Sequence, residues 1–346
     1  MNENSARRIY LAKHPEGMPT NDDLKLESVP MPAPGPGEML LRTIYLSLDP
    51  YMRGRMSPAK SYATGVKPGD TMVGATVAEV VESNIAGFAP GDIVLSYDGW
   101  CTHAVSKGKG VIKLDPKAAP VTTALGVLGM PGFTAYAGLL EHGRPKAGET
   151  VVVSAASGAV GQIVGQIAKI KGCRAVGIAG ADDKCRMILD EFGFDAAVNY
   201  KDKDFRDRLA QACPKGVDVY FENVGGDVFR AVLPLFNDFA RIPVCGRIAH
   251  YNDTALPEGP DRLSQFMGLV LTKRLSVRGF IQFDHLELMP DFRRDMVQWI
   301  RDGKVRYRED IVEGLENTVE AFRGLLTGRN RGKLVIQVGE DPTRRA

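Results

Sequence analysis

The chain has 346 residues, of which 44% are hydrophobic and 25% are charged, and its formal net charge is +2. This length allows two domains, each with its own core. The near balance of 44 basic and 42 acidic residues excludes a nucleic-acid-binding surface as a dominant feature, and no run approaches the ~20 apolar residues of a membrane span.

The first residues and the cysteines predict a cytoplasmic protein. The start, "MNENSARRIYLAKHPEG", has no apolar stretch of signal-peptide length. Five cysteines (Cys101, Cys173, Cys185, Cys213 and Cys245) are scattered and never spaced Cys-x-x-Cys. Such cysteines are typical of thiols in a reducing compartment rather than of a disulfide framework or a zinc knuckle.

Up to about residue 115 the pattern predicts short strands separated by turns. The candidates are residues 39–49, 71–83, 92–105 and 110–115, and Pro-Gly-Asp turns precede the second and third. Short strands at this spacing indicate a compact, barrel-like β domain.

From about residue 121 the pattern changes to alternating helices and strands. Residues 122–140 have helical spacing, and apolar strand candidates at 150–155, 174–180, 196–200, 217–225, 240–249 and 274–282 alternate with amphipathic segments. Strands that are apolar along their whole length predict a parallel sheet covered on both faces, which is a doubly wound α/β fold. An isolated strand near the end, residues 332–340, is expected to return to the first domain.

A glycine turn links the first strand of this region to a helix predicted over Ala159–Lys171. In the dinucleotide fingerprint G-x-G-x-x-G, Ala156 takes the first glycine position and Gly158 and Gly161 the others. A helix that starts here directs its amides at a pyrophosphate. A tight strand–helix connection without a ligand is the alternative, but the complete βαβ context favours dinucleotide binding.

The residues after the second strand favour NADPH over NADH. An NAD site places a carboxylate about 20 residues after the glycine turn, and Gly180 stands there instead. Lys184 and Tyr200 are candidates to bind the 2′-phosphate. Asp182 and Asp183 argue against an anion at this place, although their alternative role is to cap the next helix.

Several stretches, read together, resemble one family. "LSLDPYMRGRM", "AASGAVGQIVGQIAKIKGCRAVGIAG", "ENVGG", "CGRIAHYN" and "EGLENTVEAFRGLLTGRNRGKLVIQV" are similar to the zinc-independent medium-chain dehydrogenases/reductases, in the group of prostaglandin/leukotriene reductases, plant double-bond reductases and NADPH-dependent curcumin reductases. The resemblance implies a GroES-like catalytic domain (residues 1–125, completed by 308–346) and a Rossmann NADP-binding domain (126–307). It also implies a homodimer and the reduction of carbon–carbon double bonds conjugated to carbonyls.

The resemblance also implies roles for particular residues. The cofactor would contact Gly158, Ala159, Val160, Gly161, Lys184, Tyr200, Asn223, Cys245, Gly246, Tyr251, Phe280, Ile281, Gln282 and Asn330. Tyr51 and Tyr251 match positions that face the substrate, and Tyr62 lies in a loop that we expect to cover the pocket. His250 departs from the family pattern, which often has a small polar residue there.

We expect no metal in the site. The regions where zinc-dependent relatives carry ligands read "LSLDPYM", "GATVAE" and "LGMPGFTAY", without cysteine or histidine, whereas a catalytic zinc needs about three such ligands. Without a Lewis acid, conjugate reduction is the easier reaction: hydride adds to the β-carbon of an enone or enal, and a hydroxyl donor stabilises the charge on the carbonyl oxygen. Tyr251 is the first candidate for this donor, assisted by Tyr51 or by a ribose hydroxyl of the cofactor, although Tyr51 fits equally well as a packing aromatic.

Two alternatives stay open at this point. One is an NADPH:quinone oxidoreductase, and the other is a protein that binds NADPH without turnover. Neither nucleic acid nor a membrane is expected as a partner; the expected partner is a small enone or enal.

Overall fold

The computed structural model describes residues 5–255 and 259–344, and the chain divides into two compact units. Unit 1 comprises Met1–Gly126, Glu309–Asn330 and Leu334–Ala346, and unit 2 comprises Val127–Arg308 and Arg331–Lys333. The division differs from the predicted domain boundaries chiefly in the short segment Arg331–Lys333, which belongs to unit 2 although the tail on either side of it belongs to unit 1.

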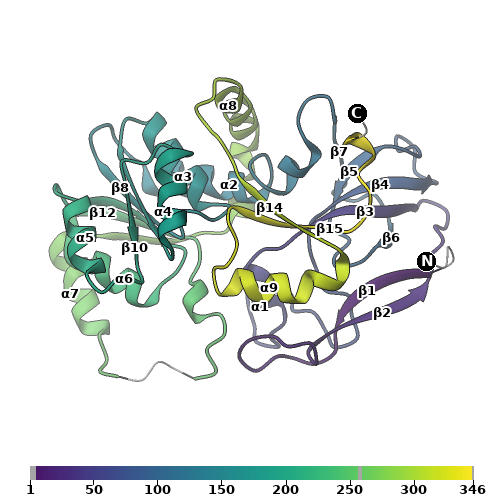
Figure 1. The fold of residues 1–346 in the computed structure, drawn as a ribbon, viewed down its shortest axis with the longest axis horizontal. Helices are drawn as coiled ribbons and strands as arrows, with labels where there is room; N and C mark the ends of the chain where they lie inside the picture. Colours follow the sequence, from purple (N-terminus) through teal and green to yellow (C-terminus); the bar gives the residue numbers. More distant parts are fainter. Residues whose placement is uncertain (1–4, 256–258, 345–346) are drawn as a thin grey trace. The chain divides into compact units, whose positions relative to one another are not determined.

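A six-stranded parallel sheet forms the centre of unit 2, in the order β10-β9-β8-β11-β12-β13 (Figure 1). The strands are β8 (Thr150–Ser154), β9 (Arg174–Ala179), β10 (Ala196–Asn199), β11 (Val217–Phe221), β12 (Phe236–Val244) and β13 (Ser276–Gly279). All five residues of β8 are buried, because a central parallel strand is covered on both faces. The predicted Rossmann-type fold is confirmed.

Helices cover both faces of this sheet. One apolar core joins the sheet to α2 (Met130–Ala137), α3 (Gly161–Ile170), α4 (Asp182–Asp190) and α8 (Met289–Arg301). A second core on the opposite face joins it to α5 (Phe205–Ala212), α6 (Gly226–Val232) and α7 (Leu263–Lys273). Shorter turns are η2 (Gly138–Gly143), η3 (Leu233–Leu235), η4 (Ile248–His250) and η5 (Gln282–Leu288).

Unit 1 contains a mainly antiparallel sheet in the order β14-β15-β3-β4-β5-β7, with β6 also paired to β3 (Figure 1). The strands are β3 (Met39–Ser47), β4 (Thr76–Ser83), β5 (Ile93–Ser96), β6 (His103–Ser106), β7 (Ile112–Lys113), β14 (Glu309–Glu313) and β15 (Lys333–Gln337). Its other elements are α1 (Tyr51–Arg55), η1 (Val121–Leu125), η6 (Leu315–Asn317), α9 (Thr318–Leu326) and η7 (Pro342–Arg344). The last strand pairs with β3, as expected for residues 332–340.

Two features of unit 1 differ from the predicted strands. A separate hairpin, β1 (Ser5–Leu11) with β2 (Leu24–Pro30), was not singled out in the sequence. The strand predicted over 92–105 is two strands, because the chain turns at Gly99. This residue has φ +85 and leaves no room for a Cβ, which would lie 2.2 Å from the carbonyl oxygen of Met72.

Two predicted helices are also corrected. The helix predicted from Ala159 begins at Gly161, since Ala155 has a left-handed backbone (φ 50) and the following residues form a turn. Residues 122–140 are not one helix but η1, α2 and the π-helical turn η2 in succession. Glycine and proline interrupt the helical pattern here. Among the residues described, no helix is both long enough and apolar enough to cross a membrane.

Candidate functional site

The predicted cofactor-binding residues of unit 2 follow the carboxyl ends of its six parallel strands. The glycine turn follows β8, Gly180 follows β9, Tyr200 follows β10, Asn223 lies two residues past β11, Cys245 follows β12 and Phe280 follows β13. Because parallel strands end at one edge, residues far apart in the sequence gather there, where open α/β sheets bind their ligands.

The glycine turn has little room for larger residues. A Cβ at Gly161 would lie 2.3 Å from the carbonyl oxygen of Ala155, and a Cβ at Gly158 would lie 3.2 Å from the same atom. Ala156, which replaces the first glycine of the fingerprint, is fully buried and fits because Gly177 on β9 leaves space for its methyl group. Ala159 and Val160 complete the turn, and no side chain caps the amino terminus of α3.

The segment Arg331–Lys333 lies against this turn, a contact that the sequence did not indicate. The amide of Gly332 donates to the carbonyl oxygen of Ser157 over 3.0 Å, and Gly332 forms a parallel bridge with Gly158. Gly332 has φ +87, and a Cβ there would lie 2.2 Å from the carbonyl oxygen of Arg308. The glycine therefore lets the tail run along the candidate phosphate loop. Asn330, the residue before this segment, is half-buried and belongs to unit 1.

Tyr200 lies over Gly180, and Lys184 follows this glycine on the next helix. A Cβ at Gly180 would lie 2.8 Å from the ring of Tyr200, so the ring lies directly over this glycine. Lys184 is in the first turn of α4 and is only 7% exposed. A phenol beside a glycine at the end of β9, with a lysine on the next helix, is a suitable anion site.

The two acidic residues in the first turn of α4 do not cap it. The cap residue is Ala181 and has no side-chain bond to the helix. Asp182 instead accepts a hydrogen bond of 2.9 Å from Asn199 Nδ2, and Asp183 forms an ion pair with Arg331 of the tail segment. The sequence analysis missed Arg331, because only the fold brings it to α4.

A buried carboxylate holds the loop after β11. Glu222 Oε1 accepts hydrogen bonds from Ser154 Oγ (3.0 Å), Tyr220 Oη (3.1 Å) and the Val224 amide (2.6 Å). Burial raises the pKa of Glu222, while these donors lower it in part. The Asn223 side chain donates to the carbonyl oxygen of Ser154 over 2.8 Å, so β8 and β11 are tied together beside the glycine turn.

The loop after β12 carries Tyr251 back over the strand end. A Cβ at Gly246 would lie 3.2 Å from Tyr251 Oη, so the hydroxyl lies close to Gly246 and is directed toward the candidate cofactor residues. His250 Nδ1 forms a hydrogen bond with Asp253 Oδ2 over 2.8 Å. A Cβ at Gly225 would lie only 3.0 Å from the His250 ring, so the ring lies close to this glycine. His250 thus packs against the glycines of "ENVGG".

Cys245 and the segment Phe280–Gln282 complete the edge. Burial raises the pKa of the Cys245 thiol to about 12, with a smaller effect of Glu222, so the thiol is protonated at neutral pH. Phe280 packs edge-on against Phe221 (6.1 Å between ring centroids), and Gln282 is buried. Ile281 between them is half-buried and extended.

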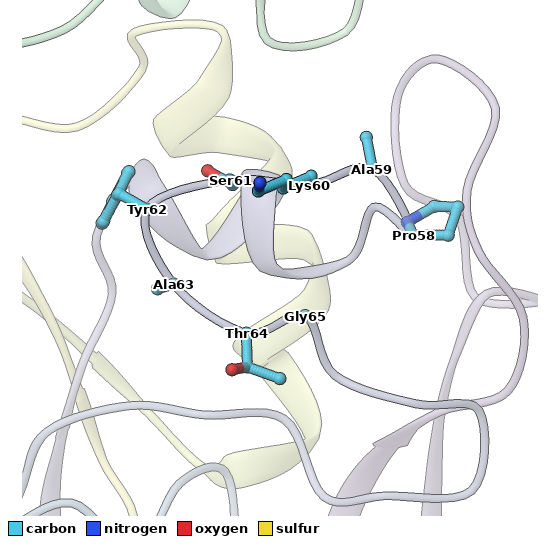
Figure 2. A pocket seen from close by; sticks show the side chains of 8 residues that line it. All are labelled: Pro58, Ala59, Lys60, Ser61, Tyr62, Ala63, Thr64 and Gly65. Atoms are coloured by element: carbon cyan, nitrogen blue, oxygen red, sulfur yellow. The ribbon is translucent and has the colours of Figure 1, made fainter.

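In unit 1, Tyr51 is the first residue of α1 and lies in a group of phenols. Burial, and next the charge of Asp49, raise the pKa of Tyr51 well above its usual value, and Tyr62 and Tyr97 add smaller effects. Tyr97 was not identified from the sequence. Tyr62 is 63% exposed and belongs to the loop Pro58–Gly65, which lines a hollow of about 340 Å³ (Figure 2).

Within residues 5–255 and 259–344, no group of three or more histidine, cysteine, aspartate or glutamate side chains is arranged to hold a metal ion.

Comparisons with known proteins agree with this fold. Residues 7–114 match the family model described as the N-terminal domain of oxidoreductase, and residues 159–302 match the one described as zinc-binding dehydrogenase. NADPH-dependent curcumin reductase of Escherichia coli (strain K12) is 53% identical over 97% of both chains. Prostaglandin reductase 1 of Bos taurus is 44% identical over 96% of this chain and 99% of its own.

A solved structure is equally similar. The structure titled as CurA in complex with NADPH from Vibrio vulnificus superposes with a TM-score of 0.94, at 53% identity, over 97% of this chain and 100% of that one. The fold and the strand-end site define a medium-chain oxidoreductase with a Rossmann domain. Within that class, the chain belongs to the zinc-independent, curcumin-reductase-like family, so the resemblance seen in the sequence is confirmed.

Proposed function

We propose that this protein uses NADPH to reduce the carbon–carbon double bond of α,β-unsaturated aldehydes and ketones. The observation that carries the proposal is the ring of Tyr200 over Gly180 at the end of β9, together with the buried Lys184 in the first turn of α4, the helix that follows. A lysine and a phenol stand there in place of the carboxylate that an NAD site needs. The relatives named for NADPH-dependent curcumin reduction and for prostaglandin reduction support the same activity.

The residues of unit 2 fit NADPH. Gly158 and Gly161, with the uncapped start of α3, would hold the pyrophosphate. Lys184 and Tyr200 would hold the 2′-phosphate, and Asn223 would lie near the ribose. The strand-end segments Cys245–Gly246 and Phe280–Gln282 would border the nicotinamide, and Asn330 would approach from the tail.

When bound, NADPH supplies a hydride to the β-carbon of the substrate. The protein then has to stabilise the negative charge on the carbonyl oxygen of the enolate until a proton adds to the α-carbon and gives the saturated carbonyl product. The Tyr251 hydroxyl near Gly246 is the proposed hydrogen-bond donor to that oxygen. Tyr51 is the second proposed donor: a phenol is protonated at neutral pH in any case, and burial raises the pKa of Tyr51 further above its ordinary value. We propose that no metal takes part, since the positions that bind zinc in other family branches lack histidine and cysteine.

Unit 1 is proposed as the GroES-like catalytic domain and unit 2 as the NADPH domain. The loop with Tyr62 would cover the substrate. A cytoplasmic location remains a prediction from the cysteine pattern.

A homodimer is proposed through the edge of the unit 2 sheet. β13 is the last strand of this sheet, and all four of its residues are exposed. Leu263, Met267 and Leu271, spaced four residues apart on α7, are 62%, 54% and 76% exposed. An unpaired strand edge next to an exposed apolar helix face suits an isologous contact with a second copy.

The reaction is tested by following NADPH absorbance with a 2-alkenal, a conjugated ketone and a naphthoquinone, with NADH in parallel. We expect NADPH consumption with the enal and the enone, weaker use of NADH, and a saturated carbonyl product by mass spectrometry and NMR. An allylic alcohol as product would contradict the proposal. Preference for the quinone would favour quinone oxidoreductase activity, and tight NADPH binding without any turnover would favour a binding protein.

A further inference from the structure

Two histidines that are distant in the sequence meet in unit 2, outside the residues assigned to NADPH and substrate. His142 belongs to the π-helical turn η2, and His285 lies at the point in η5 where the backbone departs from helical geometry (φ −129, ψ 27). Their Nε2 atoms are 3.0 Å apart. The side chain of His285 is 14% exposed and that of His142 is partly buried, so both rings are held in place and remain within reach of a small ion.

The geometry of the pair fits convergence on one ion. The two Nε2 atoms are 3.0 Å apart. If both bound one metal ion with metal–nitrogen bonds of about 2.05 Å, the nitrogen–metal–nitrogen angle would be about 94° and the ring centroids would lie about 4.7 Å apart. The observed centroid distance is 4.8 Å. A straight N–H···N hydrogen bond of the same length would place the centroids about 5.3 Å apart. The two rings share a hydrogen bond between their Nε2 atoms, and their centroid distance lies nearer to the value for convergence on one ion than to the value for a straight hydrogen bond.

A carboxylate lies near the second nitrogen of His285. Glu287 Oε1 is 3.6 Å from His285 Nδ1, the ring nitrogen that is not part of the pair, which is an ion-pair distance and longer than a hydrogen bond. Metal-binding histidines usually offer their second N–H to a carboxylate or carbonyl, which fixes the ring and its tautomer. On the other side, the ring of His142 packs against Phe280 at 5.3 Å between centroids, so its orientation is also restricted.

We propose that His142 and His285 form a binding site for a divalent transition-metal ion, such as Zn²⁺, Ni²⁺ or Cu²⁺. Imidazole nitrogen suits these ions, and water completes the coordination because the site has two protein ligands. The bound ion links η2 to η5 through one histidine from each segment. Neither histidine is among the residues assigned to the reaction, so this proposal goes beyond the proposed reaction and does not depend on it.

The test is calorimetric titration of ZnCl₂ into the full-length chain, without a histidine tag and freed of metal by dialysis against a chelator. We expect one Zn²⁺ per chain with a dissociation constant in the micromolar range, and a loss of at least tenfold in His142→Gln and in His285→Gln. His103→Gln, on β6 of unit 1, is the matched control and should bind as the parent does. The melting temperature of each variant, measured without metal, checks that it is folded.

A second measurement needs no variant. One equivalent of Cu²⁺ added to the parent chain should give an electron paramagnetic resonance spectrum with splitting from two equatorial nitrogens. The proposal is overturned if binding does not saturate at one ion, if both histidine variants bind Zn²⁺ as tightly as the parent, or if the copper spectrum shows fewer than two nitrogens.

Discussion

Arg331 of the tail segment forms an ion pair with Asp183, the residue directly before Lys184 on α4. The negative charge of Asp183, which would repel a 2′-phosphate, is thereby neutralised. The pair is held by the backbone, because the neighbouring Gly332 is bonded to Ser157 of the glycine turn.

This relationship predicts a charge effect on cofactor choice. Arg331→Ala leaves Asp183 uncompensated beside the proposed phosphate site, so NADPH affinity should fall about fivefold to tenfold and NADH affinity should hardly change. The double variant Arg331→Ala/Asp183→Asn should recover most of the loss. Fluorescence titration with both cofactors measures this, and equal losses for NADPH and NADH would place Arg331 away from the phosphate.

Lys184 is expected to have the larger effect. A charge-assisted hydrogen bond contributes about 1.5–3 kcal/mol, so Lys184→Ala should weaken NADPH binding by about 10- to 100-fold and leave NADH binding nearly unchanged. Lys171→Ala, at the carboxyl end of α3, is the control of equal charge change. If Lys184→Ala affects both cofactors alike, the 2′-phosphate binds elsewhere.

Tyr251 should affect turnover rather than cofactor binding. Removing its hydroxyl in Tyr251→Phe takes away the donor to the developing oxyanion, and kcat should fall about 10- to 100-fold while the Kd for NADPH stays within about twofold. Tyr10→Phe, on β1, controls for the loss of a phenol. Steady-state kinetics with an enone decide, and an unchanged kcat would remove Tyr251 from the mechanism.

The raised pKa of Glu222 predicts that the stability of the folded protein depends on pH. Its pKa is raised in the folded protein above the ordinary value of 4.5, so the folded state holds this proton more tightly than the unfolded state does. The stabilisation is complete below the unfolded pKa and is lost as the pH rises through the folded pKa. Glu222→Gln keeps the acceptor oxygen for Ser154 and Tyr220 but removes the titration.

The stability of Glu222→Gln relative to the parent should therefore increase from pH 4.5 toward pH 8, as measured by urea unfolding. Glu82→Gln, exposed on β4, should show no such trend. A difference that stays constant with pH would mean that Glu222 titrates in the same way in both states.

The proposed dimer contact at β13 and α7 can be tested by placing one charged side chain on α7. Leu271→Lys places an ammonium on the exposed face of α7 and should convert the dimer to monomers in sedimentation velocity, because a buried unpaired charge is costly. Leu189→Lys, at a 38% exposed site on α4, should leave the assembly unchanged. A parent chain that sediments as a monomer would reject the homodimer itself.

The sequence by itself determined the Rossmann unit and most of its candidate site. Strands that are apolar along their length require a sheet buried on both faces, and the glycines at 158 and 161 lie where the backbone leaves no room for a side chain. Residues that follow each strand, such as Tyr200 and Cys245, could be assigned to one edge because parallel strands all end there. Lys184 was found for the same reason.

Contacts between distant segments were decided only by the tertiary structure. The sequence gives no period or motif that joins Arg331 to Asp183, His142 to His285, or Glu222 to Ser154, since such pairs depend on how loops return to the sheet. The sequence predicts that this helix begins at Ala159, whereas α3 begins at Gly161, for a related reason. Ala155 has a left-handed backbone, and its carbonyl oxygen accepts the Gly158 amide in a tight turn that Gly161 approaches closely. Local helix propensity carries no information about such a turn.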